Sequence, residues 1–173
     1  MWTRLSRIFK HRWHSEALAQ RAIPPELLDR LTAQVKRSEA GHSGEIRIFV
    51  EAGLPLSYLT RSSSMAHITR ERALALFGKL RVWDTAHNNG VLIYLLLAER
   101  RIEIVADRGL YERVTPDTWP KLVKRMSAAF KAGDYETGLT EAVQEVNALL
   151  RRHFALQTGQ NNPNELPDKP VLN

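Results

Sequence analysis

Two short polar loops hold the residues of this sequence that are best suited to chemistry. Asn88 and Asn89 precede one apolar run, and Asp107 and Arg108 follow another. The side chains that could gather around these loops are Asp84, His87, Asn88, Asn89, Asp107, Arg108 and Glu112. Carboxylate and amide oxygens from separate loops are the ligands that Ca²⁺ and Mg²⁺ select. The same residue types are common in plain turns, because asparagine and glycine tolerate positive φ, so both interpretations stay open.

Whether the two loops meet depends on the strands that carry them. The run from Val91 to Leu97 is almost continuously apolar, which is typical of a central strand covered on both faces. Residues 101–107 form a second strand pattern, and the very short connection between the two predicts an antiparallel hairpin. The end of the second strand then lies beside the start of the first. The sequence therefore predicts that the two polar loops are neighbours.

A third strand is predicted upstream of the hairpin. Residues 45–51 alternate in the manner of a strand, and a helical pattern that we expect to be capped by Thr69 separates them from Val91. A strand, a helix and a strand in this order form a right-handed crossover with the two strands parallel. The sheet is therefore expected to be mixed, and residues 42–44, at the start of this strand, should lie at the same edge as the two loops.

The remaining segments are predicted to be helices, one loop and a tail. The expected starts or caps of further helices are Pro24-Pro25, Asp117 or Thr118, and Asp134. Residues 52–68 are expected to be irregular, with a short edge strand around Tyr58 as an alternative. Residues 155–173 are polar, contain proline and lack periodicity, so we predict a disordered C-terminal tail.

Composition narrows the classes of function. The chain has 173 residues, a formal net charge of +6 and no cysteine, and we expect one domain with tails. The absence of cysteine excludes disulfides, thiolate nucleophiles, zinc ribbons and iron–sulfur clusters. The longest uncharged apolar run, Val91 to Ala98, is far shorter than the roughly 20 residues of a membrane-spanning helix. No apolar signal segment follows the basic N-terminus, so we expect a cytoplasmic protein.

The N-terminal segment, residues 1–22, is predicted to be a basic amphipathic arm. The apolar and basic residues at helical spacing are Trp2, Arg4, Leu5, Arg7, Ile8, Phe9, Lys10 and Trp13. One interpretation is a helix on an anionic membrane surface, since indole rings suit the interface and cations attract anionic lipid. We favour a helix packed on its own domain or on a partner, because the segment is short. Nucleic acid is not expected, since charges elsewhere alternate in sign, as in Arg70-Glu71-Arg72.

Three motifs give the chain a resemblance to a known family. The segments NNGVLIYLL, IEIVADRGLYE and FKAGDYETGL, in this order, resemble the TPM domain, which is named for thylakoid lumen and photosystem-repair proteins and a nematode receptor modulator. The resemblance covers about Pro24 to Phe154, and we delimit the domain as residues 23–154. It implies an α/β/α sandwich around a short mixed β-sheet, with helices on both faces. This agrees with the βαβ unit and the antiparallel hairpin expected above.

The resemblance also carries expectations about function. Members of the family have been described as metal-binding, a weak acid phosphatase activity has been proposed for plant relatives, and others resemble assembly or repair accessories. Bacterial members often have a signal peptide and a transmembrane helix. We find neither pattern here, and expect the arm to substitute as a peripheral attachment at the inner face of the membrane. The family has glycine at the loop position of Arg108, a cation that would repel a metal ion at Asp107 unless it points away.

Two hypotheses for function follow. The first, which we prefer, is a binding or accessory module that docks on a membrane-associated protein partner or an anionic lipid surface through the arm and residues 52–68, and that also binds Ca²⁺ or Mg²⁺. The second is a weak metal-dependent acid phosphatase that hydrolyses phosphomonoesters, with Arg108 and His87 binding the phosphate. The predicted metal ligands are Asp84, Asn88, Asn89 and Asp107. No phosphatase motif is found, so no catalytic residue is assigned.

Overall fold

The computed structural model describes residues 2–13, 16–157, 159–160 and 162–173, and the side chains of residues 2–5 and 16 lie outside that description. The helices are α1 (Trp2–Trp13), α2 (Glu16–Ala22), α3 (Pro25–Glu39), α4 (Leu56–Leu59), α5 (Met65–Lys79), α6 (Arg108–Tyr111), α7 (Thr118–Ala132) and α8 (Tyr135–Phe154). The strands are β1 (Ile46–Glu51), β2 (Val91–Leu96), β3 (Arg101–Ala106) and β4 (Val171–Leu172). Among these described helices, none is long and apolar enough to cross a membrane.

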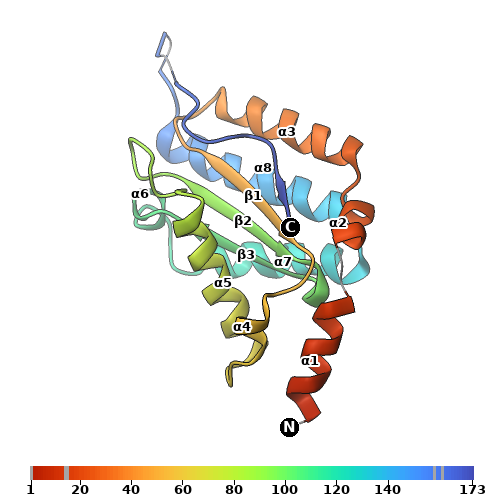
Figure 1. Ribbon diagram of the computed structural model, residues 1–173. Coiled ribbons are helices and arrows are strands. Elements are labelled where there is room, and N and C mark those ends of the chain that lie inside the picture. Colours follow the sequence, from red (N-terminus) through yellow and green to blue (C-terminus); the bar gives the residue numbers. More distant parts are fainter. Residues whose placement is uncertain (1, 14–15, 158, 161) are drawn as a thin grey trace.

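The strands form one mixed sheet in the order β3-β2-β1-β4 (Figure 1). β1 and β2 are parallel, with Ile46 opposite Val91. β2 and β3 are antiparallel, with Val91 opposite Ala106, and a short 3₁₀ turn at Leu97–Glu99 joins them. The predicted βαβ unit and hairpin are therefore confirmed. The start of β2 and the end of β3 lie at one edge of the sheet, as the loop hypothesis requires.

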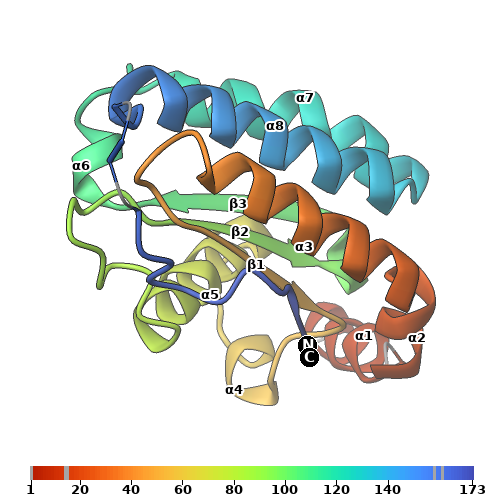
Figure 2. The same cartoon turned by 90° about the horizontal axis from the view of Figure 1, so that it is seen from above.

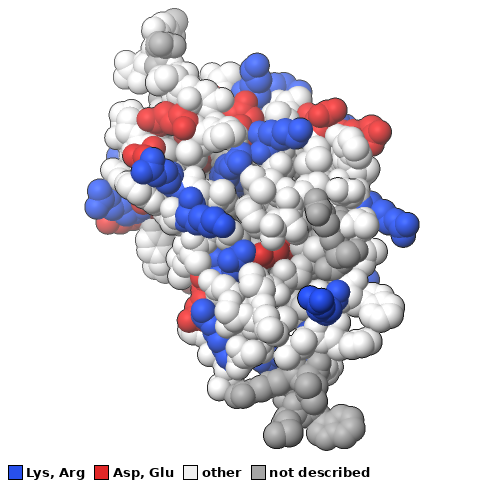
Figure 3. All heavy atoms as spheres, in the orientation of Figure 1, with Lys and Arg blue, Asp and Glu red and all other residues white. Residues whose placement is uncertain are grey.

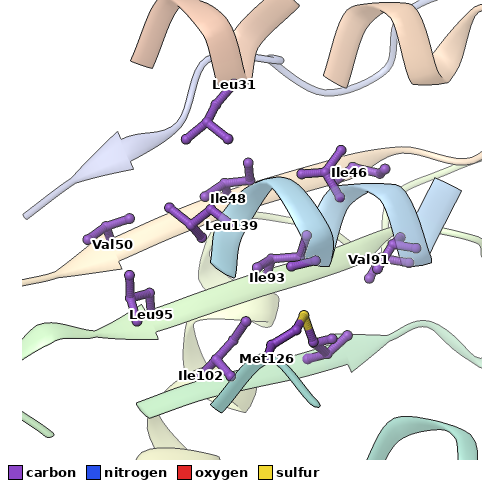
Figure 4. Packing of buried hydrophobic residues seen from close by; sticks show 14 of the residues in the cluster. Leu31, Ile46, Ile48, Val50, Val91, Ile93, Leu95, Ile102, Met126 and Leu139 are labelled. Atoms are coloured by element: carbon purple, nitrogen blue, oxygen red, sulfur yellow. The ribbon is translucent and has the colours of Figure 1, made fainter. Parts of the chain in front are cut away.

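Helices cover both faces of the sheet. Figure 2 shows α3, α7 and α8 on one face, and α4 and α5 on the other. The alternation along β1 explains this, because Ile46, Ile48 and Val50 belong to the core on the α3/α7/α8 face while Phe49 belongs to the core on the α5 face. Side chains from the strands and from all three helices of the first face meet there (Figure 4). The fold is the α/β/α sandwich expected from the resemblance.

The helix boundaries after β3 follow the expected local signals. The Asp134 carboxylate accepts the Thr137 N–H at 3.1 Å, so Asp134 caps α8 as predicted. Gly133, at φ 82°, ends α7 in the left-handed conformation that glycine adopts without steric cost. α7 begins after Asp117, but the Asp117 side chain makes no cap hydrogen bond, unlike the cap expected there. The helix accommodates Pro120 in its first turn, where the missing N–H would have no helical partner.

The predicted loop at residues 52–68 is wrong in part. A short helix, α4, forms at residues 56–59, where the alternative was an edge strand around Tyr58. α5 begins at Met65, and its cap is Ser64, which accepts the His67 N–H at 3.3 Å. Thr69, the predicted cap, lies within the helix and donates its hydroxyl to the Met65 carbonyl at 2.7 Å. Both hydroxyl roles are available to Ser and Thr, so local sequence did not distinguish them.

The prediction of a disordered C-terminal tail is wrong for residues 162–173, while residues 158 and 161 of that tail lie outside the described residues. Val171 and Leu172 form β4, parallel to Phe49 and Val50 of β1. Leu166 is only 9% exposed and joins the core on the α5 face. The segment owes this order to pairing with a strand that is distant in sequence, which its polar local composition does not show.

The fold predicts opposite effects for two glycine substitutions. A Cβ at Gly90 would overlap the Val82 carbonyl oxygen, whereas a Cβ at Gly78 in α5 would meet no atom within 4 Å. We expect Gly90→Ala to destabilise the protein by about 1–3 kcal/mol, as overpacking does. Gly78→Ala should stabilise it by about 0.5–1 kcal/mol, because alanine is the better helix former. Thermal unfolding measures both, and a Gly90→Ala variant that melts with the wild type would contradict the close contact.

Candidate functional site

The two polar loops that drew attention in the sequence lie against each other. The Asp107 N–H donates to the Gly90 carbonyl at 2.9 Å, and the Gly109 N–H donates to the Asn88 carbonyl at 2.8 Å. The Asn89 side-chain amide donates to Ser43 Oγ at 3.2 Å, which brings in the segment before β1. The predicted meeting of three chain segments at one edge of the sheet is therefore correct. We call this place the polar edge.

Local backbone geometry allows the loops to come this close. Asn88 adopts a positive φ of 51°, which asparagine tolerates better than most residues. The carbonyl oxygens of His87 and Asn88 lie 2.5 Å from where a Cβ on Gly109 would stand. Only glycine fits at this position without displacing the opposite loop. Gly109, in the first turn of α6, therefore allows the two loops to pack.

Two oxygen atoms at the polar edge are suited to a cation. Asn89 Oδ1 and Asp107 Oδ2 are buried and have no hydrogen-bond partner among the described residues. The other Asp107 oxygen accepts the Arg108 N–H at 2.7 Å and so caps α6. Buried acceptors without a partner carry a desolvation cost. A hard cation would offset that cost for both oxygens.

The other predicted ligands are placed differently. The Asp84 side chain is 55% exposed and lies 4.0 Å from the Arg81 guanidinium. Asn88 Oδ1 accepts a hydrogen bond from the Arg108 guanidinium at 3.2 Å. In the part of the chain that the structure describes, no group of three or more His, Asp or Glu side chains is placed to hold a metal ion. His87 is exposed, as is Glu112. Of the predicted ligands, Asn89 and Asp107 are therefore the two that keep a buried oxygen without a hydrogen-bond partner among the described residues.

A second polar centre beside the polar edge was missed in the sequence. Glu39 Oε1 accepts the Ile46 N–H at 2.8 Å, and His42 Nε2 lies 2.9 Å from Ser38 Oγ. The Glu45 carboxylate accepts the N–H groups of residues 165 and 166, at 3.2 and 3.1 Å. A cavity of about 330 Å³ opens here, lined mainly by Lys36, Glu39, Glu45, Asn162, Asn164 and Asp168. The signal available in the sequence was Glu45, a charged residue at the start of the predicted strand 45–51.

Burial shifts the titration of this second centre. Burial, together with repulsion from Glu45 and Asp168, raises the pKa of Glu39 to about 9. Burial lowers the pKa of His42 to about 4 and raises the pKa of Glu45. At neutral pH the Glu39 carboxyl therefore holds a proton and the His42 ring is neutral. Both groups are therefore uncharged at neutral pH, and they do not form a reactive ion pair.

The opposite end of the sheet holds an ionic network. Glu51, at the end of β1, is fully buried, and its carboxylate accepts two hydrogen bonds from Arg72, at 2.6 and 3.0 Å. The Tyr94 hydroxyl donates to the same carboxylate at 2.7 Å. Burial, with the negative charge of Glu51 beside it, raises the pKa of the Tyr94 hydroxyl. Every oxygen of Glu51 is thus satisfied, and the network fixes α5 to the end of β1.

The N-terminal helix α1 is attached at this same end, far from α6 (Figures 1 and 2). His11 is buried; its Nδ1 accepts the Leu54 N–H at 3.0 Å, and its Nε2 lies 3.0 Å from Glu99 Oε1. Lys10 forms an ion pair with the same Glu99 oxygen at 3.0 Å. Arg7 donates to the Ser63 carbonyl at 3.2 Å. The side chains of Trp2, Arg4 and Leu5, also predicted for the arm, lie outside the described residues.

The opposite side of α1 presents aromatic rings to solvent. Phe9 is 67% exposed and Trp13 is 71% exposed, and their ring centroids lie 5.4 Å apart. Leu56 of α4 is 61% exposed. A groove of about 480 Å³ between α1 and α4 is lined by Ile8, His11, Arg12, Leu54, Pro55, Leu56 and Leu59. We call Phe9 and Trp13 the apolar patch.

Comparison with known proteins identifies similar domains. Residues 20–149 match the family model of the TPM domain. Nine chains of known structure match the chain. The BA42 protein of the psychrophilic bacterium Bizionia argentinensis is 24% identical, with a TM-score of 0.71 over 87% of this chain and 95% of that one. The N-terminal domain of a protein from P. gingivalis is 20% identical, with a TM-score of 0.52 over 77% and 81%. The curated proteins gave no match.

The protonated state of Glu39 predicts a pH dependence of stability. Its pKa is about 9 in the folded protein against an ordinary value of 4.5, so unfolding releases a proton between these values. The stabilising contribution is complete below about pH 4.5 and is lost as the pH rises through 9. In that window the free energy of unfolding should fall by up to about 1.4 kcal/mol per pH unit.

Glu39→Gln tests this expectation, because glutamine imitates the protonated carboxyl and still accepts the Ile46 N–H. Thermal unfolding across the window should show a smaller decrease with pH in this variant than in the wild type, and equal stability near pH 4. Glu141→Gln, at an exposed position of α8, is the control and should follow the wild type. Parallel pH profiles of Glu39→Gln and wild type would refute the protonated state.

Proposed function

This chain belongs to the TPM domain family, as the sequence motifs suggested, and we propose that it acts as a peripheral accessory module at an anionic membrane surface. In this proposal the α1 helix attaches the domain to the membrane, and the domain binds a protein partner in that membrane. The proposal places the protein at the cytoplasmic face. The observation that carries it is the exposed Phe9–Trp13 pair on a helix whose other side is fixed to the domain.

The contacts of α1 support a helix that packs on the domain with one side and exposes aromatic rings on the other. His11 and Lys10 connect it to Glu99, and His11 also caps the Leu54 N–H. These contacts fit the interpretation we favoured in the sequence, a helix packed on its own domain. They also orient the aromatic rings outward, so the rings are available to a surface without any loss of the docking contacts. A pre-ordered surface loses less entropy on binding.

The chemistry of the apolar patch suits a lipid surface. Clustered exposed apolar side chains mark interaction sites in soluble domains. Burying one large apolar side chain contributes about 1.5–3 kcal/mol, and each basic residue near an anionic membrane adds about 1 kcal/mol. Arg12 lines the groove beside Leu56, so cation and apolar surface lie together. On the face shown in Figure 3, Lys and Arg are interspersed with Asp and Glu rather than gathered in one field, which disfavours nucleic acid.

A second candidate function is divalent-cation binding at the polar edge. The two buried oxygens without partners, on Asn89 and Asp107, favour it. A bound Ca²⁺ or Mg²⁺ would be held by these oxygens and would polarise a phosphoryl oxygen, which is what the acid phosphatase alternative requires. Arg108 is engaged by Asn88 and His87 is the remaining phosphate-binding candidate. We therefore rank cation binding above hydrolysis.

Vesicle co-sedimentation tests the membrane proposal. The Phe9→Ala/Trp13→Ala double variant should bind anionic vesicles at least about 10-fold more weakly than the wild type, since a loss of 1.4 kcal/mol is tenfold. Leu74→Ala is the matched control, because Leu74 is 49% exposed on α5, away from the apolar patch. Uncharged vesicles should bind less than anionic ones. Equal pelleting of the double variant and the wild type would remove α1 as the attachment.

Thermal unfolding with added Ca²⁺ or Mg²⁺ tests the second candidate. At a concentration of about one hundred times the dissociation constant, a cation should stabilise the protein by about 2.7 kcal/mol. Asp107→Asn preserves the α6 cap but removes the charge, and should abolish the shift. Asp84→Asn should retain it, because the Asp84 side chain is exposed beside Arg81. No shift with either cation, or an undiminished shift in Asp107→Asn, would exclude the site.

A further inference from the structure

The C-terminal segment, residues 162–173, lies along the outer edge of β1. It lies beyond the matched TPM region, which ends at residue 149. Its last residues pair with β1 as β4, and its first residues lie beside the polar edge. Figure 1 shows this segment following the length of β1. Its contacts with β1 resemble those of a bound peptide more than those of a core strand.

Main-chain groups of the segment are bound by two charged side chains of β1 and its approach. The Glu45 carboxylate accepts the N–H groups of Glu165 and Leu166, at 3.2 and 3.1 Å. The Arg47 guanidinium donates to the carbonyls of Pro167 and Lys169, the latter at 2.7 Å. Glu45 is fully buried and Arg47 is 8% exposed. Glu45 thus binds two backbone N–H groups and Arg47 binds two backbone carbonyls. Both side chains recognise the backbone of an extended peptide, largely independently of the peptide's side chains.

Four apolar positions anchor the segment. Leu166 is 9% exposed and packs in the core on the α5 face, and Pro170 is buried. Val171 and Leu172 pair with Phe49 and Val50 in parallel register.

The end of the segment is bound as firmly as its anchors. The Asn173 carbonyl accepts the Ala52 N–H at 2.7 Å, and the Asn173 N–H donates to the Val50 carbonyl at 3.0 Å. Extended pairing with a few side-chain anchors is the mode by which exposed sheet edges take up strands from other chains.

Residues 157–161 connect the segment to the domain, and we call them the tether. Between Leu156, whose N–H reaches the Gly41 carbonyl at 3.4 Å, and Asn162, the described residues make hydrogen bonds only with each other, between Gln157 and Gln160. Residues 157–161 could span roughly 17 Å when extended. The described residues of this connection, Gln157, Gly159 and Gln160, are exposed.

We propose that the outer edge of β1 is a strand-acceptor site, and that the C-terminal segment of a second copy of this chain can occupy it by exchange. This edge is complementary to this sequence at every position described above, so the segment of another copy makes the same contacts. Without an occupant, β1 would be an open edge strand, and the charges of Glu45 and Arg47 would lose their partners. The site is therefore filled either in cis or in trans. This inference does not depend on α1 or on a cation.

Cleavage of the tether tests the acceptor site in the intact, folded protein. A protease site is introduced at residues 157–160, the chain is cut after folding, and a fluorescent peptide of residues 162–173 is added. The cut chain should take up the peptide with an apparent affinity at least about 100-fold higher than the uncut chain, because the tethered segment competes at millimolar effective concentration. The same peptide with Leu166→Asp is the matched control and should not bind.

Each outcome decides the acceptor site. Absence of uptake by a cut chain that keeps its circular dichroism spectrum would overturn it. Unfolding on cleavage would also overturn it, since the segment would then be part of the core rather than an occupant.

Exchange between copies is tested with two differently tagged full-length chains. They are mixed at high concentration after brief opening in mild denaturant and are returned to native buffer. Mixed dimers should form, as seen by co-purification and light scattering, and Leu166→Asp in both chains should prevent them. A wild type that remains monomeric up to millimolar concentration would refute a second copy of the chain as the occupant.

Discussion

The buried charges of β1 and its approach dictate how the rest of the chain is arranged. Glu45, Arg47 and Glu51 are 0%, 8% and 0% exposed, and a buried charge destabilises a fold unless it is paired or fully hydrogen-bonded. On β2 only the Tyr94 hydroxyl supplies such a partner, to Glu51 at 2.7 Å, because the rest of β2 is apolar. The C-terminal segment supplies partners for Glu45 and Arg47, and α5 supplies Arg72 for Glu51. Two segments distant in sequence are thus fixed to one strand.

Several features specified by neighbours in sequence could be predicted, although the Ser64 cap of α5 could not. The order of the C-terminal segment, which distant partners specify, could not be predicted either. The hairpin, the crossover and the Asp134 cap follow from periodicity, a short connection and one side-chain acceptor, and all three are present. The order of the C-terminal segment depends on Glu45 and Arg47, about 120 residues away. Its polar composition indicated disorder because the partners of those polar groups lie outside any local window. The charges on β1 were the available signal.

The polar edge shows the same division at the level of single atoms. Topology placed Asn89 and Asp107 at one edge, and the sequence was sufficient for that. It could not reveal that Arg108 would bond Asn88 Oδ1, or that Asp84 would lie exposed beside Arg81. Side-chain direction in a turn depends on contacts that form only after folding. Of the four predicted ligands, Asn89 and Asp107 each keep a buried oxygen without a partner among the described residues.

The C-terminal segment connects the two ends of the sheet. At its start the Glu165 carboxylate accepts the Ala86 N–H at 3.0 Å, within the loop that leads to the polar edge. At its end the Asn173 amide donates to Glu51 at 3.3 Å, in the ionic network at the opposite end. A segment from a second copy would bring its own Glu165 and Asn173 to the same atoms. Exchange would then preserve every local contact. Each polar edge would, however, be stabilised by the segment of the other chain, so dimerisation and the stability of the polar edge would be coupled.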